Sequence, residues 1–97
     1  MDIEFIEPAT IELDDAIDYY NLQLQGLGKK FFEEVLQTIN LISVFPEVWV
    51  KNSEYTRKAI LKKFPYNLIY LNYNDMIYII AVAHQHREPD YWIDRVL

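Results

Sequence analysis

The 97-residue chain has no cysteine, two glycines and four prolines. The absence of cysteine excludes a disulfide framework, a thiolate zinc site and a cysteine nucleophile. With 52% hydrophobic residues, the chain carries enough apolar surface to offset the entropy of ordering, which excludes a disordered or linker-rich protein. The longest apolar run, Met76 to Ala83, has eight residues, whereas a bilayer requires about 20. We therefore expect a single cytoplasmic domain over residues 1–97 that does not contact membranes.

Basic residues are missing from the first part of the chain. Residues 1–28 contain seven acids and no base, a charge of −7, whereas residues 29–97 contain eight acids and nine bases, a charge of +1. The total of −6 argues against a protein that coats nucleic acid. Five of the bases fall within residues 51–63 beside a single acid. We expect any anion-binding surface around Arg57 to Lys63; the alternative is a solvated sheet edge whose lysines oppose aggregation.

The first half of the chain predicts a short strand and two helices. Polar and apolar residues alternate over residues 2–7, as in a half-buried strand. Pro8 suits the first turn of a helix, and apolar residues then recur at helical spacing to Leu24. The acids of this helix lie mostly off the apolar stripe and are interpreted as solubilising or as favourable to the helix dipole.

A tight turn over Gly26 to Gly28 predicts an antiparallel helical hairpin. The second helix is expected to end near Phe45, because Pro46 disfavours helix at the residue before it. Its apolar stripe is taken to run through Phe32, Val35, Leu36, Ile39 and Ile42. The side chains expected between the helices and a sheet are Ile17, Tyr20, Phe32 and Ile39.

The second half of the chain predicts three strands, at about 55–61, 66–73 and 76–84, after an irregular connection over 46–54. Asn74-Asp75 is a plausible two-residue hairpin turn between the last two strands. The last strand is apolar on both faces, so we expect it at the centre of the sheet. We expect its alanines, Ala81 and Ala83, beneath a helix, and its bulkier face beneath a partner chain or the C-terminal tail. The predicted fold is α+β, with a two-helix antiparallel hairpin on a mainly antiparallel sheet and the order β-α-α-β-β-β.

Residues 83–95 combine two imidazoles, two guanidinium groups, several carboxylates and two aromatic rings. Three interpretations remain open. If the strand stayed extended, four potential metal ligands would share one face: His84, His86, Glu88 and Asp90. Alternatively, a histidine moves protons on a phosphodiester while cationic groups stabilise the developing charge: Arg57, Lys62, Lys63 or Arg87. In the third interpretation Arg87 joins the strand to the helices, and Tyr91 and Trp92 form an aromatic lid.

An ordered series of motifs runs along nearly the whole chain. It comprises Ala9-x-x-Glu12-Leu13-x-x-Ala16-x-x-Tyr19-Tyr20, Gly26-Leu27-Gly28-x-x-Phe31, Phe45-Pro46, Arg57-Lys58-x-x-Leu61, Phe64-Pro65-Tyr66-x-x-x-Tyr70 and Ala83-His84-x-x-Arg87-x-Pro89-x-Tyr91-Trp92-x-x-Arg95. This series resembles the ParE/RelE superfamily of toxins from bacterial type II toxin–antitoxin (plasmid stabilisation) modules, particularly the ParE-like branch. The resemblance implies the same helical hairpin on a small sheet.

The resemblance also implies partners and two alternative activities. A cognate antitoxin would wrap over the toxin. The chain would then form a hetero-oligomer with the antitoxin or a homo-oligomer with copies of itself. RelE-like members cleave mRNA on the ribosome without metal or cofactor, whereas ParE-like members inhibit DNA gyrase by binding it. For a RelE-type site the candidate catalytic residues are Arg57, Lys62, Lys63, His84, Arg87 and Tyr91. The acidic pI of about 4.7 favours the gyrase-binding class; a non-toxic relative that still binds antitoxin is the third alternative.

Overall fold

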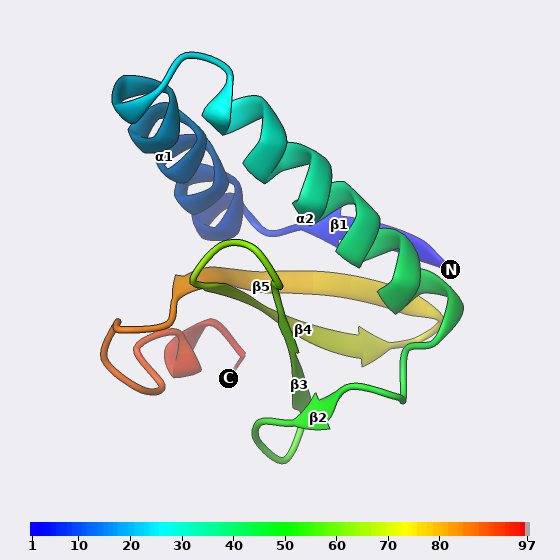
Figure 1. Cartoon of the computed structure of the whole chain (residues 1–97). Helices are drawn as coiled ribbons and strands as arrows, with labels where there is room; N and C mark the ends of the chain where they lie inside the picture. Colours follow the sequence, from blue (N-terminus) through cyan, green and yellow to red (C-terminus); the bar gives the residue numbers. More distant parts are fainter. Residues whose placement is uncertain (97) are drawn as a thin grey trace.

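The computed structural model describes residues 1–96. Its elements are β1 (Asp2–Phe5), α1 (Glu7–Gln23), α2 (Leu27–Val44), β2 (Val50–Lys51), β3 (Thr56–Ile60), β4 (Tyr66–Tyr73), β5 (Met76–His84) and a short 3-10 helix, η1 (Ile93–Arg95). The five strands form one sheet in the order β1-β5-β4-β3-β2, in which only the β1–β5 pair is parallel. The helices cover one face, and the chain after β5 folds over the other (Figure 1). The predicted α+β architecture is confirmed, with β2 added in the segment expected to be irregular.

The helical hairpin closes where the sequence places its two glycines. Gly26 has a left-handed backbone, with φ of 87°, which a glycine adopts without strain. Gly28 lies against α1: a Cβ there would come within 2.5 Å of the carbonyl oxygen of Ile17. Its N–H donates to Oδ1 of Asn21 at 2.9 Å. The turn therefore brings α1 and α2 together at a distance that only glycine permits.

Neither helix has the length and apolar character of a membrane span within residues 1–96.

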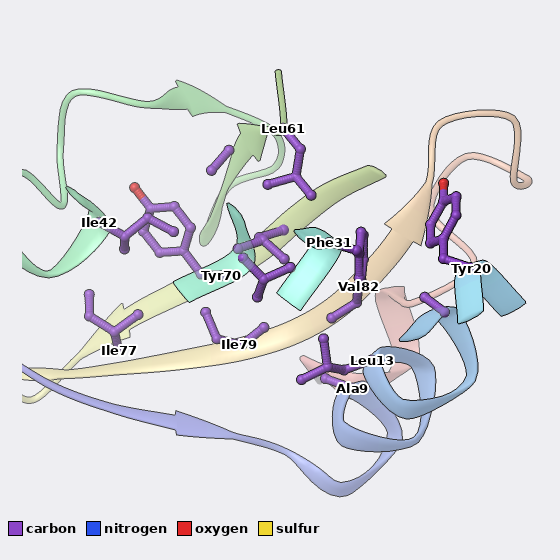
Figure 2. Packing of buried hydrophobic residues seen from close by; sticks show 14 residues of the cluster. Ala9, Leu13, Tyr20, Phe31, Ile42, Leu61, Tyr70, Ile77, Ile79 and Val82 are labelled. Carbon is purple, nitrogen blue, oxygen red and sulfur yellow. The ribbon is translucent and has the colours of Figure 1, made fainter. Parts of the chain in front are cut away.

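The core between the helices and the sheet is centred on an aromatic cluster. Phe31 is fully buried, and its ring centroid lies 5.3 Å from that of Tyr20, 5.2 Å from that of Phe64 and 5.1 Å from that of Tyr66. Figure 2 shows Phe31 next to Val82 of β5, with Tyr20 at one side of the same core cluster. Burial of Tyr20 confirms the predicted face of α1.

The expected buried face of α2 is right at Val35 and Ile42, which are fully buried, and wrong at Phe32 and Leu36. Phe32 is 37% exposed, and Leu36 is also exposed, whereas Ile39 and Ile17 are half-buried. The residues that α2 buries are Gly28, Phe31, Val35, Thr38 and Ile42. Thr38 is tolerated there because its hydroxyl donates to the carbonyl oxygen of Glu34 at 2.8 Å. The buried face includes the polar Thr38, whereas the stripe predicted from the sequence is wholly apolar. The predicted stripe was therefore the stronger pattern in the sequence.

The β4–β5 hairpin contains the expected two-residue turn. Asn74 and Asp75 have φ of 51° and 62°, the pair of left-handed conformations that a type I′ turn requires. Tyr73 and Met76 are paired across the turn, so the strands begin in register directly beside it.

A β-bulge changes which faces of β5 are buried against the helices. Ile69 of β4 pairs with Ala81, but the next residue, Tyr70, pairs with Ile79, so Ile80 has no partner in the β4 register. The helix-side core accordingly contains Ile77, Ile79 and Val82. A second cluster on the opposite face contains Ile69, Ile80, Ala81, Ala83 and Trp92. The expected alternation is therefore wrong beyond Ile79: the alanines lie beneath the tail rather than beneath a helix.

Candidate functional site

Glu12 of α1 binds polar groups of the tail, which we define as residues 85–96. Its Oε1 accepts hydrogen bonds from the Val82 N–H at 3.0 Å and from Nη1 of Arg95 at 2.9 Å. Its Oε2 accepts from the Tyr91 hydroxyl at 2.7 Å and from Nη2 of Arg95 at 3.1 Å. The carboxylate thus joins α1, β5 and the tail.

The end of β1 explains why a carboxylate lies here. β1 pairs with β5 only as far as Ile79, so the following backbone groups of β5 face no strand on that side. Glu12 accepts from Val82 N–H, and Nη1 of Arg95 donates to the Ile80 carbonyl at 3.0 Å. The ion pair therefore takes the place of strand pairing, which meets the requirement that buried backbone groups be hydrogen-bonded.

Tyr91 is held as a neutral hydrogen-bond donor. Burial raises the pKa of its hydroxyl far above the ordinary value of 10.0, and the hydrogen bond and charge of Glu12 raise it further. The hydrogen bond to Glu12 likewise raises the pKa of Arg95 above its ordinary value. Both groups keep their protons near neutral pH, so Tyr91 is poorly suited to act as a base.

Arg87 occupies the outer side of the same cluster. Its guanidinium carbon lies 4.0 Å from the centroid of the Tyr91 ring, a cation–π geometry. Its Nη1 is 3.9 Å from Oε2 of Glu12, and 55% of its side chain is exposed, against 20% for Arg95. Arg95 is the inner partner of Glu12, and Arg87 presents its charge to solvent.

His84 ends β5 beside the tail. Its ring packs edge-on against Tyr66 at 5.1 Å, and its Nδ1 accepts the backbone N–H of His86 at 3.1 Å. An imidazole that accepts at Nδ1 carries its proton on Nε2. Because β5 ends here and the chain turns, the extended run on which four metal ligands would share a face does not form. A cavity of about 190 Å³ beside the tail is lined by His84, Arg87, Tyr91 and Lys58, among others.

The basic segment is divided between different parts of the fold. Arg57 lies on the helix side of β3, opposite Tyr70, and its Nη1 donates to the Trp49 carbonyl at 2.8 Å. Lys62 and Lys63 follow β3, and their backbone N–H groups bind the carboxylate of Glu34 on α2. The six candidate residues thus lie in three places: His84, Arg87 and Tyr91 meet at the tail, Arg57 lies on β3, and Lys62 and Lys63 lie beside α2.

Sequence reasoning missed Glu12 and Arg95 as the centre of this cluster, and Lys58 as the basic residue of β3 that lines the adjacent cavity. One signal for Glu12 was present. It lies three residues after Ala9 and four before Ala16, both buried, so helical periodicity places it on the inner face of α1. The partners of Glu12 could not be inferred because they lie 70 to 83 residues away in sequence.

A groove of about 840 Å³ separates α2 from the loop between β3 and β4. Its lining includes apolar side chains (Leu27, Leu41, Trp49, Ile60 and Phe64) and charged ones (Lys30, Glu33, Glu34, Lys62 and Lys63). Trp49 contributes a buried indole N–H that has no hydrogen-bond partner among residues 1–96. An occupant of this groove would bury apolar area.

Residues 3–89 match the family model described as "ParE toxin of type II toxin-antitoxin system, parDE". The chain belongs to this family. A ParE-family toxin is one component of a type II toxin–antitoxin system, so membership implies a cognate antitoxin as partner. The resemblance seen in the sequence motifs is confirmed.

Two solved structures share the fold of this ParE-family chain. A chain of the chromosomal ParDE system from P. aeruginosa superposes with a TM-score of 0.75 at 17% identity, covering 87% of this chain and 95% of that one. The isolated E. coli RelE toxin superposes with a TM-score of 0.67 at 18% identity, covering 99% and 98%. No curated protein matches the sequence. At these identities the superpositions establish the fold alone.

Proposed function

We propose that this ParE-family toxin acts by binding a protein target such as DNA gyrase, and that its cognate antitoxin neutralises it. The observation that carries the proposal is the engagement of Tyr91 by Glu12. Tyr91 donates a hydrogen bond to a carboxylate and its pKa is raised, so its hydroxyl serves the architecture of the tail. A nuclease that used Tyr91 as its proton carrier would require this hydroxyl to be free to exchange a proton with RNA.

The dispersal of the basic side chains supports the same proposal. Cleavage of a phosphodiester requires several donors arranged around one phosphate. Arg57 is bonded to Trp49 on the helix side of the sheet, whereas Arg87 lies on the tail side. Lys62 and Lys63 lie in the groove beside α2. A ribosome-dependent endoribonuclease is the second candidate, favoured by the cavity that His84, Arg87 and Lys58 share.

The groove beside α2 is where we place the antitoxin. Exposed apolar side chains continue beyond it along the end of α2 and the following loop: Val44, Phe45 and Val48. A partner segment that folds on binding can cover such a surface, and acidic side chains on it would meet Lys62 and Lys63.

The proposal is tested by purified toxin in a gyrase supercoiling assay, together with inducible expression in a bacterial host. We expect supercoiling to slow at micromolar toxin, and growth to stop while transcripts stay intact. Lys62→Ala should be as inhibitory as wild type. Transcripts cut at translated codons, with gyrase unaffected, would establish the nuclease instead, and Lys62→Ala and Arg87→Ala would then test which basic groups it uses.

A further inference from the structure

The tail cluster contains two guanidinium groups on one carboxylate, and the fold uses them differently. Arg95 makes three hydrogen bonds, two to Glu12 and one to the Ile80 carbonyl, and its side chain is 20% exposed. Arg87 lies 3.9 Å from Glu12, beyond hydrogen-bond distance, and its side chain makes no hydrogen bond within residues 1–96. Arg95 therefore neutralises Glu12, and the cluster presents the positive charge of Arg87 at the surface.

The position of Arg87 is nevertheless constrained from two sides. The Tyr91 ring supports the guanidinium plane at 4.0 Å, and Glu12 attracts it from the interior. An exposed arginine normally loses conformational entropy when it binds a partner. A guanidinium already held in place loses less, and its donors remain free for a planar acceptor such as a carboxylate.

We propose that Glu12 is a positioning residue, which through Tyr91 and its own charge holds Arg87 ready to bind a carboxylate of the protein target. This inference rests on the proposed function for the identity of the target, but not for the positioning itself. Other charges border the same surface: Lys58, Glu88 and Asp90 line the adjacent cavity. Glu88 and Asp90 make the placement of Arg87 matter, because a mobile guanidinium could pair with either of them.

The positioning is tested first by NMR of the free toxin, using the Nε–H signal of Arg87. In wild type we expect the dynamics of an ordered side chain, and in Glu12→Gln those of a mobile one. Glutamine has the shape of glutamate and keeps an acceptor for the Val82 N–H, so the fold should persist. Asp15→Asn, which removes an exposed carboxylate of the same helix, should leave the signal unchanged. If Glu12→Gln does not fold, Tyr91→Leu provides the second test by removing the ring beneath Arg87.

The functional consequence is measured as the toxin dose that halves growth of an expressing host. Arg87→Ala and Glu12→Gln should each raise this dose by about tenfold, and the double variant should be no weaker than Arg87→Ala alone. The proposal would be overturned if the double variant raised this dose by the product of the two single effects. It would also be overturned if the Arg87 signal were as mobile in wild type as in Glu12→Gln. If growth stops and gyrase is unaffected, the proposed target is wrong while the positioning stands or falls by the NMR result. If wild type does not arrest growth, the toxin function fails and the same NMR comparison still decides the positioning.

Discussion

Adjacent phenylalanines on α2 offer a direct test of how the core is packed. Phe31 is fully buried in the aromatic cluster, whereas Phe32 is 37% exposed. Phe31→Ala should cost about 3–5 kcal/mol of unfolding free energy, because it removes a ring that three other rings contact and leaves a cavity. Phe32→Ala should cost about 1 kcal/mol, since the ring is partly solvated and alanine favours the helix.

The difference is large against the total stability of a domain of this size, about 5–15 kcal/mol. Urea denaturation followed by tryptophan fluorescence should show it, and the melting temperatures of the two variants should differ by roughly 10–30 °C. If Phe31→Ala leaves too little folded protein, Phe31→Leu gives a smaller loss on the same scale. Equal losses at the two positions, or a greater loss at Phe32, would refute the assigned face of α2.

Three further predictions concern the turn, the tyrosines and the tail. Asp75→Gly should stabilise the protein by about 0.5–1 kcal/mol, because glycine adopts the observed φ of 62° without strain; an unchanged urea midpoint would argue against a type I′ turn. Burial raises the pKa of Tyr70 to about 12, so the folded state keeps a proton that the unfolded state releases near 10.0. The stability that Tyr70 contributes through this difference is fully present below pH 10 and is lost as the pH rises toward 12. In urea midpoints measured across that range, Tyr70→Phe should therefore show a smaller decrease with pH than wild type. Arg95→Met should cost about 1.5–3 kcal/mol and expose the tail to limited proteolysis, and a tail as resistant as that of wild type would contradict the role of the ion pair.

The elements that the sequence predicted well are those with local causes. Pro8 and Pro46 delimit the helices through backbone sterics, and Gly26 and Gly28 fix their connection. The β4–β5 hairpin follows from a two-residue turn between apolar runs. Each of these signals acts within a few residues, so no knowledge of the tertiary structure is needed to interpret it.

The errors arose where tertiary contacts decide which residues of an element are buried. On α2 two apolar stripes overlap, and only packing against the sheet selects the one that includes Thr38. The bulge at Ile80 shifts the faces of β5 by one residue, which alternation alone does not reveal. For the candidate site, the tail was predicted as the chemically distinctive segment, and Arg87 and Tyr91 do meet there. Whether any of the six candidates is catalytic stays a prediction.

The parallel pairing of β1 with β5 also has a consequence for the order of folding. α1 and α2 can form a hairpin as soon as both have been synthesised, but β1 must wait for residues 76–79. Glu12 meets its partners later still, because two of them, Tyr91 and Arg95, are 79 and 83 residues further along the chain. During synthesis the growing chain therefore carries an unpaired edge strand until residues 76–79 have emerged, and an unneutralised carboxylate until residues 91–95 have emerged. Chains closed by such distant contacts fold late, so a frameshift within the tail should harm this protein as much as one in its core.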